Sequence, residues 1–329
     1  MIGTGGTIAS EVTPEGLSPE LDPGRLLDFI PNIRNLCEVD CLQCYNLDST
    51  NIRPEHWVGL ARVIRENYDR YDSFVISHGT DTMAYTASAL SYLVQGSPKP
   101  IVITGAQKPI WFDGTASKRN LTDAFLYACH GTGGVVIVFD GKVILGTRAR
   151  KTYSKSFQAF SSVNYPVLAT MQDEKLLQYI QGECLDAPLF YDHLHTGVGL
   201  LKLVPGMDSD VIEYMLERYD GLIIESFGVG GLPEYSDFYS VVSQAAERGK
   251  LIVMTTQVPN EGSDLSVYHV GGRLKSTVRL LEAYDMTTES ALTKLMWIMG
   301  QTRDFDTAKR LFYTPVAKDI LYSIHYATD

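Results

Sequence analysis

The sequence predicts an α/β fold in two domains, each with a parallel or mixed sheet flanked by helices. Short apolar segments of strand length recur along the chain with helical patterns between them. Runs that are apolar almost throughout are typical of strands covered on both faces. Their alternation with helices favours a doubly wound sheet. A break in this rhythm near residues 181–201 divides the chain in two.

The elements follow in order along the chain. The expected strands are FVIS (74–77), IVITG (101–105), GVVIVFDG (134–141), GLIIESFG (221–228) and KLIVMTTQ (250–257). The expected helices include residues 54–68, 82–94, 120–129, 239–249 and 287–301, with a further helix over DTAKRLFYTP. Since 329 residues exceed the usual size of one domain, we predict a larger N-terminal domain over residues 1–183, a linker over 184–205, and a smaller C-terminal α/β domain with a parallel sheet over 206–329.

The charge balance bears on possible partners. A formal net charge of -11 offers no basic excess to neutralise phosphates, which argues against nucleic acid and an anionic membrane surface as partners. A small neutral or zwitterionic substrate fits better. The sequence has no signal-peptide pattern at its start and no apolar run of membrane-spanning length. The cytoplasm is therefore the expected location.

Three of the five cysteines are clustered in the sequence. Cys37, Cys41 and Cys44 form C-x3-C-x2-C, a spacing that resembles the iron–sulfur ligands of radical S-adenosylmethionine enzymes. The surrounding CEVDCLQCYNLDST has an extended pattern, and an extended backbone does not bring three thiolates onto one cluster. We favour cysteines used as small strand residues. Elsewhere, no His/Cys/carboxylate group has metal-ligand spacing, so no metal is expected.

Chemistry is expected where strands end. In open α/β sheets, ligands bind outside the carboxyl ends of the strands, and HGTDT (78–82), GAQKP and FGVGGLP follow expected strands. TGGTIAS (4–10) adds two hydroxyls around Gly5 and Gly6, which let the backbone approach a ligand. Phosphate binding is a weak alternative, because this loop lacks both the third glycine of a dinucleotide fingerprint and the Gly-Lys-Ser/Thr of a P-loop.

HGTDT combines a hydroxyl and a carboxylate, in Thr80 and Asp81. Such a carboxylate can hold a substrate ammonium by charge-assisted hydrogen bonds or relay a proton. For an isolated HGTDT the simpler reading is that Asp81 caps the helix starting near Thr82, with Thr80 in the turn. The combination with TGGTIAS favours the chemical role.

A hydroxyl nucleophile needs a base, and Lys151 in GTRARKTYS is the candidate. Lysines have a reference pKa of about 10.4 and act as bases at neutral pH when desolvated or close to other cations. Arg148 and Arg150 are such cations. The alternative is that Lys151 is one basic residue in a solvated cluster, and spacing alone favours neither interpretation.

Several segments, in order, resemble the asparaginase/glutaminase family of two-domain threonine amidohydrolases, and the cytoplasmic type I bacterial enzymes in particular. They are TGGTIAS, NLDST, HGTDTMAYTASAL, PIVITGAQ, KT (151–152), FSSVNYP and ESFGVGG. The resemblance implies hydrolysis of L-asparagine to L-aspartate and ammonia without a cofactor. It also implies a homodimer or homotetramer.

The resemblance assigns roles by position. Thr7 matches the family nucleophile, which attacks the side-chain amide and forms an acyl-enzyme. Thr80, Asp81 and Lys151 match a second triad that activates a threonine hydroxyl or the hydrolytic water.

Other positions match the family's substrate contacts. Ser49 and Thr50 of NLDST match ligands of the α-carboxylate, and Asp81, beside Thr80, matches the α-amino ligand. Ala106 matches a backbone contact to the amide.

Two features depart from the family pattern. Many members carry a tyrosine on a mobile lid ten residues after the nucleophile, where this chain has Leu17, which cannot supply that hydrogen bond. Only MIG precedes Thr4, where the family has an apolar strand. We therefore expect that strand to be almost missing, with a truncated start as the leading explanation and an unpaired backbone edge as the consequence.

Two alternatives share these motifs. One is the amidase subunit of a transfer-RNA-dependent amidotransferase, which usually carries an additional N-terminal domain and which the acidic charge disfavours. The other is an amino-acid sensor that binds ligand without turnover.

Overall fold

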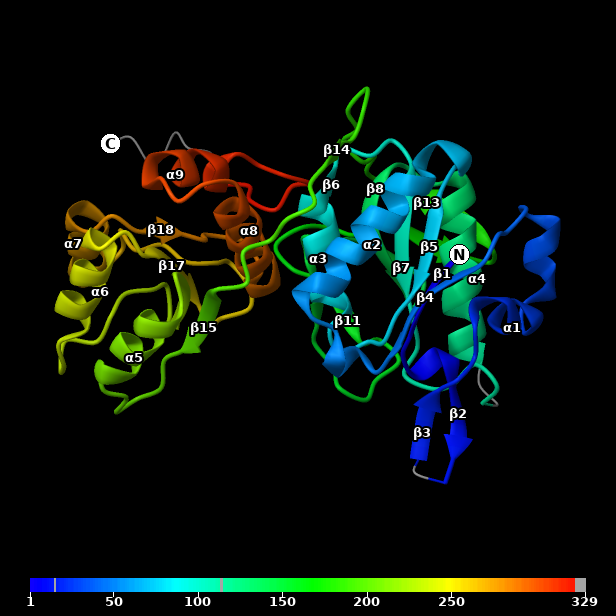
Figure 1. Cartoon of the computed structure of the whole chain (residues 1–329), viewed down its shortest axis with the longest axis horizontal. Coiled ribbons are helices and arrows are strands. Elements are labelled where there is room, and N and C mark those ends of the chain that lie inside the picture. The colour runs from blue at the N-terminus through cyan, green and yellow to red at the C-terminus, as the bar shows by residue number, and fades with distance from the viewer. Residues whose placement is uncertain (15, 113–114, 323–329) are drawn as a thin grey trace. The chain divides into compact units, whose positions relative to one another are not determined.

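The chain forms two compact units, Met1–Asp192 and His193–Asp329. The computed structural model describes residues 1–14, 16–112 and 115–322, without the side chains of residues 17 and 115. Each unit has its own main sheet with helices packed against it (Figure 1). The expected two-domain α/β fold is thus confirmed, while the predicted boundaries at residues 183 and 205 stay predictions.

An eight-stranded mixed sheet forms the centre of the first unit, in the order β13-β12-β9-β8-β7-β5-β1-β4. Neighbouring strands are parallel from β4 to β8 and antiparallel from β8 to β13. The strands are β1 (Ile2–Gly5), β4 (Leu42–Leu47), β5 (Phe74–Ser77), β7 (Pro100–Thr104), β8 (Gly134–Phe139), β9 (Lys142–Leu145), β12 (Ala169–Gln172) and β13 (Lys175–Gln178).

Helices and short hairpins surround this sheet. The α-helices are α1 (Pro23–Asp28), α2 (Pro54–Asn67), α3 (Met83–Leu93) and α4 (Thr115–His130), and the 3-10 helices are η1 (Thr7–Ala9), η2 (Pro31–Asn35), η3 (Ser49–Asn51) and η4 (Tyr68–Arg70). The small two-stranded pairs are β2 (Ser10–Thr13) with β3 (Gly16–Pro19), β6 (Val94–Gln95) with β14 (Leu189–Phe190), and β10 (Ala149–Lys151) with β11 (Phe160–Ser162).

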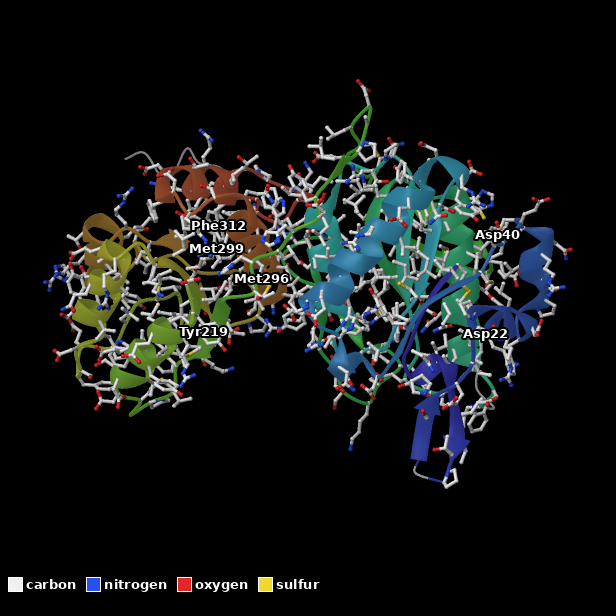
Figure 2. The ribbon with its side chains drawn as sticks, in the orientation of Figure 1. Asp22, Asp40, Tyr219, Met296, Met299 and Phe312 are labelled. Carbon is white, nitrogen blue, oxygen red and sulfur yellow. The ribbon has the colours of Figure 1, made fainter. Side chains whose placement is uncertain are left out.

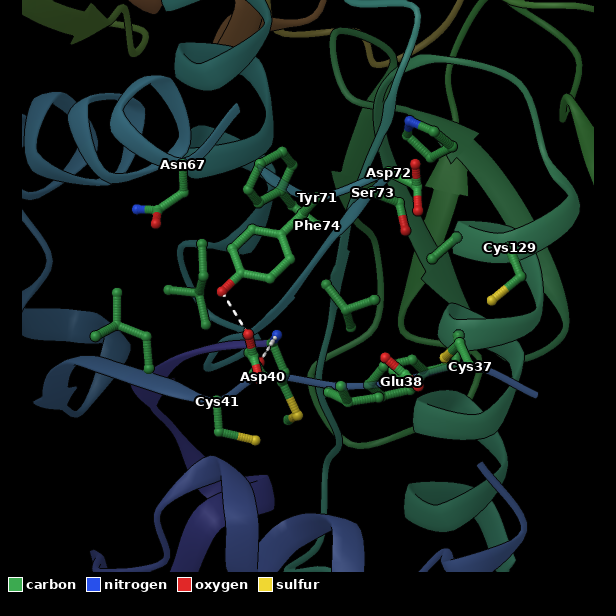
Figure 3. A pocket seen from close by; sticks show the side chains of 18 of the residues that line it. Cys37, Glu38, Asp40, Cys41, Asn67, Tyr71, Asp72, Ser73, Phe74 and Cys129 are labelled. Atoms are coloured by element: carbon green, nitrogen blue, oxygen red, sulfur yellow. Dashed lines mark hydrogen bonds between the residues drawn. The ribbon is translucent and has the colours of Figure 1, made fainter. Parts of the chain in front are cut away.

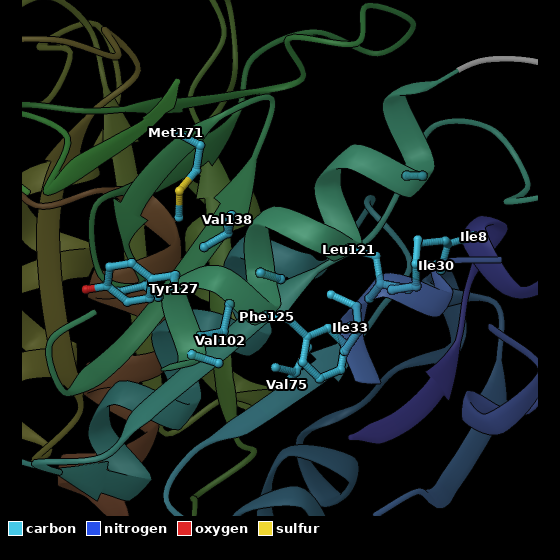
Figure 4. Close-up of a cluster of buried hydrophobic side chains, with 14 of the residues drawn as sticks. Ile8, Ile30, Ile33, Val75, Val102, Leu121, Phe125, Tyr127, Val138 and Met171 are labelled. Atoms are coloured by element: carbon cyan, nitrogen blue, oxygen red, sulfur yellow. The ribbon is translucent and has the colours of Figure 1, made fainter. Parts of the chain in front are cut away.

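Apolar strands hold the core of this unit together. The register pairs Val75 with Val102 and Val102 with Val136, so these side chains point to one face of the sheet. That face packs against α4, through side chains such as Phe125 and Leu121 (Figure 4). Because both faces are covered, β5 and β7 are buried along their whole length.

The second unit contains a smaller, four-stranded parallel sheet. Its strands are β15 (Val198–Lys202), β16 (Gly221–Ser226), β17 (Leu251–Thr256) and β18 (Leu281–Glu282), in sequence order. Its helices are α5 (Asp210–Arg218), α6 (Phe238–Glu247), α7 (His269–Thr277), α8 (Thr288–Gln301) and α9 (Phe305–Tyr313). Met299 of α8 and Phe312 of α9 are buried in this unit (Figure 2).

The expectation of a nearly missing first strand is wrong. Ile2–Gly5 forms β1, so the strand includes the first two residues of TGGTIAS. β1 pairs in parallel with β4 on one side and β5 on the other. The motif's own backbone therefore occupies the sheet, and the expected unpaired edge is not there.

Candidate active site

Four loops of the first unit meet at one edge of its sheet. β4, β1, β5 and β7 are consecutive neighbours and parallel, so their carboxyl ends lie together. β1 is followed by η1, β4 by η3, β5 by the HGTDT loop and β7 by the loop at Gly105. These segments carry the predicted residues Thr7, Ser49, Thr80 and Ala106.

Glycines allow three of these loops to touch. A Cβ on Gly6 would lie 2.3 Å from the backbone nitrogen of Gly79, and Gly6 has a φ of +80°. A Cβ on Gly79 would lie 2.6 Å from Ser49 Oγ. The turn that carries Thr7 thus packs directly on the HGTDT loop, which in turn packs on Ser49.

Lys151 joins the two polar side chains of HGTDT. Its Nζ donates to Thr80 Oγ1 at 2.8 Å and to Asp81 Oδ1 at 2.5 Å. The lysine side chain is 15% exposed, whereas that of Asp81 is 57% exposed. An aliphatic stem shielded from water therefore holds the ammonium against a carboxylate that faces solvent.

Both alternative readings of these residues are wrong. Thr82, not Asp81, is the N-cap residue of α3, and the Asp81 carboxylate contacts Lys151 instead. The basic segment is not a solvated cluster, because Arg148 is fully buried and Lys151 is largely so.

Gln107 is a site residue that sequence reasoning missed. Its Nε2 lies 3.4 Å from the carbonyl oxygens of both Ser154 and Ser156. Carbonyls only accept, so these contacts fix the amide orientation and turn Oε1 toward Thr80, whose hydroxyl donates to it at 3.3 Å. The signal for this residue was its place beside Ala106 in the loop after a buried strand.

The NLDST residues divide into two environments. Ser49 Oγ accepts from the Asp81 backbone N–H at 3.3 Å, and the Ser49 carbonyl accepts from Thr82 Oγ1 at 2.7 Å. Thr50 is exposed and bonds Asp48, with both its N–H and its hydroxyl 2.8 Å from Asp48 Oδ1. Ser49 is therefore fastened to the HGTDT loop, and Thr50 to the residue that caps η3.

His78 connects the HGTDT loop to α3 by hydrogen bonds. Trp57 Nε1 donates to Thr86 Oγ1 at 2.9 Å, and Thr86 Oγ1 lies 2.9 Å from His78 Nε2. His78 Nδ1 lies 2.7 Å from the Gly79 carbonyl, which requires the proton on Nδ1 and leaves Nε2 to accept from Thr86. Complete burial lowers the pKa of His78 to about 4, so the ring stays neutral.

Three further residues that the sequence singled out are Thr7, Ala106 and Leu17. Thr7 is half-buried at the start of η1, and its carbonyl accepts from the Ser10 N–H. Ala106 is buried in the loop after β7. The backbone of Leu17 pairs with Val12 in the β2–β3 hairpin, and its side chain lies outside the described residues.

A separate cavity of about 800 Å³ lies at the opposite, amino end of the strands (Figure 3). It is lined in part by Cys37, Cys41 and Cys129. Only Cys44 of the C-x3-C-x2-C run lies within a strand, so the strand reading is wrong for Cys37 and Cys41.

Among the described residues, no His/Cys/carboxylate group is arranged to hold a metal ion. None of the described helices has the length and apolar character needed to cross a membrane.

Known proteins resemble this chain over nearly all of its length. Residues 1–182 match the family model "Asparaginase, N-terminal", and residues 197–312 match "Glutaminase/Asparaginase C-terminal domain". The L-asparaginase of Thermococcus kodakarensis is 39% identical, covering 97% of this chain and 98% of that protein. Its solved structure superposes with a TM-score of 0.91, covering 98% of each chain.

Two further similarities are informative. A glutamyl-tRNA(Gln) amidotransferase subunit of Pyrococcus horikoshii is 30% identical, covering 97% of this chain and 76% of that protein. A probable cytoplasmic L-asparaginase from Campylobacter jejuni is 27% identical in structure comparison, with a TM-score of 0.81, covering 94% of this chain and 97% of that chain. With both of its domains matched, the chain belongs to the L-asparaginase family.

Proposed function

We propose that this chain hydrolyses L-asparagine to L-aspartate and ammonia through a threonine acyl-enzyme. The observation that carries the proposal is the contact of Lys151 Nζ with Thr80 Oγ1 and Asp81 Oδ1, at 2.8 and 2.5 Å. This contact joins a hydroxyl, an amine and a carboxylate at the carboxyl ends of the strands, where Thr7 also lies. Family membership supports an amide as substrate.

In the first half-reaction, Thr7 is the nucleophile. Its hydroxyl oxygen forms a bond to the side-chain amide carbon of asparagine, the C–N bond breaks, and ammonia leaves with the hydroxyl proton. Negative charge builds on the former amide oxygen in the tetrahedral intermediate, and each well-placed N–H donor there contributes about 10²- to 10³-fold.

In the second half-reaction, water hydrolyses the aspartyl ester. A hydroxyl or water is a weak nucleophile until a base takes its proton. Thr80, Lys151 and Asp81 form the proton-transfer group: Lys151, as the neutral amine, takes the proton of the water through the Thr80 hydroxyl, a role that contributes about 10²- to 10⁴-fold. The water oxygen bonds to the acyl carbon, and the proton returns to the Thr7 oxygen as the ester bond breaks.

Substrate recognition uses the same loops. The Asp81 carboxylate holds the substrate α-ammonium. The Asp81 side chain is 57% exposed, so a ligand in solvent can reach it. Ser49 and Thr50 hold the α-carboxylate, and the backbone at Ala106 contacts the amide. No cofactor and no metal take part in this scheme.

The wider assignments rest on family resemblance. We infer a cytoplasmic homodimer or homotetramer that acts on a small molecule, with neither nucleic acid nor a membrane as partner. The site lies near the boundary between subunits, and a neighbour's C-terminal domain contributes to it.

Ammonia release distinguishes this function from its two alternatives. Wild-type protein and Thr7→Ala are mixed with L-asparagine or L-glutamine in single-turnover and steady-state assays. The proposal expects ammonia from L-asparagine with wild type and none with Thr7→Ala. Binding of L-asparagine without ammonia release would favour a sensor. Ammonia released only in the presence of an amidotransferase partner and its misacylated transfer RNA would favour the amidase-subunit alternative.

A further inference from the structure

The segment after β7 holds the turn that carries Thr7 by two hydrogen bonds. The Ile110 N–H donates to the Ile8 carbonyl at 3.1 Å. The indole Nε1–H of Trp111 donates to the Ser10 carbonyl at 2.7 Å, across 101 positions of sequence. These two bonds fix the backbone immediately after Thr7.

A third bond continues this path to Thr7 itself. The Ser10 N–H donates to the Thr7 carbonyl and closes the 3-10 turn η1. Ser10 is also the first residue of β2, where it pairs with Pro19 of β3. Trp111 therefore contacts the junction between the turn and the β2–β3 hairpin.

The exposure of Trp111 sets it apart from the other tryptophans. Trp111 is 40% exposed, whereas Trp57 and Trp297 are 5% and 3% exposed. A ring this exposed adds less to the core than a buried one. Its distinctive contribution is the short, directed bond to Ser10.

We propose that Trp111 is a positioning residue, which holds the Thr7 turn in its reactive placement through the Ser10 carbonyl. The inference rests on the proposed function, because Thr7 is the nucleophile only there. A neutral hydrogen bond is worth up to about tenfold in a rate. Misplacement of a reacting group by about 1 Å costs about 10²-fold. Loss of the indole donor is thus expected to lower kcat by about 10- to 100-fold.

The test compares Trp111→Phe with Phe112→Leu. Phe112 is a matched control because it is adjacent and 45% exposed, and its ring lies 6.3 Å from that of Trp111. Steady-state kinetics with L-asparagine, thermal unfolding, and hydrogen exchange of the peptide covering residues 7–13 are measured on both. Trp111→Phe is expected to lower kcat with KM changed less than about threefold, to leave the thermal midpoint unchanged, and to speed exchange in that peptide. Phe112→Leu leaves all of them unchanged.

A second variant removes the donor alone. Benzothienylalanine at position 111 keeps the shape of the indole and replaces its N–H by sulfur, so it tests the bond even if Trp111→Phe folds poorly. Unchanged kcat and exchange in this variant overturn the inference, as does a parallel loss of stability and kcat. If wild type releases no ammonia, the proposed function fails separately, and the exchange measurement still decides whether Trp111 holds the turn.

Discussion

The ammonium of Lys151 lies 2.8 Å from the hydroxyl oxygen of Thr80. The two residues are 71 positions apart in sequence, on β10 and on the loop after β5. Lysine ammonium has donors only, so the Thr80 proton points elsewhere, and Gln107 Oε1 accepts it at 3.3 Å. This arrangement makes the hydroxyl of Thr80 the centre of the site's hydrogen bonds.

Replacing Lys151 by methionine removes the amine and keeps a chain of similar length. We expect kcat with L-asparagine to fall by about 10²- to 10⁴-fold, because proton transfer at Thr80 is lost. Lys155→Met is the matched control, since Lys155 is exposed in the same connection between β10 and β11. A Lys151→Met enzyme with wild-type kcat would rule out the proposed role.

Thr80→Val tests whether the two residues act as one unit. The single variant should lose about as much kcat as Lys151→Met, and the double variant should lose little more than either, because groups in one proton path are not additive. Multiplicative losses in the double variant would show that the residues act independently.

Gln107→Leu removes the acceptor for the Thr80 hydroxyl and the donors to two backbone carbonyls. Since a neutral hydrogen bond contributes about 0.5–1.5 kcal/mol, kcat should fall by up to about tenfold. The comparison is Gln158→Leu, the same substitution at an exposed position of the β10–β11 connection. If the two variants changed kcat equally, the result would show that Gln107 has no role in the site.

Gly6→Ala tests the close contact between the Thr7 turn and the HGTDT loop. Both Gly6 and Gly249 have positive φ, at 80° and 82°, but a Cβ on Gly249 meets nothing within 4 Å. Gly249→Ala therefore carries the strain of a positive φ alone, about 1–2 kcal/mol of unfolding free energy, whereas Gly6, with a ψ of 174°, also lies in a region that is essentially restricted to glycine. Gly6→Ala should lose more stability and nearly all activity. Denaturant unfolding and ammonia release check this, and equal destabilisation by both variants would contradict it.

His78 predicts how stability depends on pH. Its folded pKa of about 4 lies below the ordinary value of 6.5, so the unfolded chain binds the proton first as pH falls. The stability due to the neutral ring is fully present above pH 6.5 and is lost by about pH 4, about 3 kcal/mol in all. Urea unfolding from pH 7 to 4 should show a shallower loss for His78→Gln than for wild type. His130→Gln, at an exposed histidine, should follow wild type; a wild-type slope in His78→Gln contradicts the assignment.

The sequence predicted the parts of the molecule that depend on local pattern. FVIS is β5, residues 54–67 form α2, and residues 288–301 form α8, because apolar runs and helical periodicity decide burial locally. The loops after β5 and β7 could be placed at the site from the strand-end rule alone.

Other features needed the three-dimensional contacts. The depth of Arg148 and Lys151 excludes a solvated basic cluster, and spacing contains no information on depth. The contacts of Gln107 and Trp111 join residues 27 and 101 positions apart. The strand β1 was missed because two of its four residues are glycines, which give no apolar signal.

The central claim is that Thr7 becomes the aspartyl ester. Wild type and Lys151→Met are mixed with L-asparagine, quenched in acid during the first turnover, digested and analysed by mass spectrometry. The account predicts a mass increase of one aspartyl group on the peptide that contains Thr7, with more of it in Lys151→Met because hydrolysis of the ester is slowed. An adduct on the peptide that contains Thr80, or ammonia release in the first turnover with no adduct on Thr7, would contradict it.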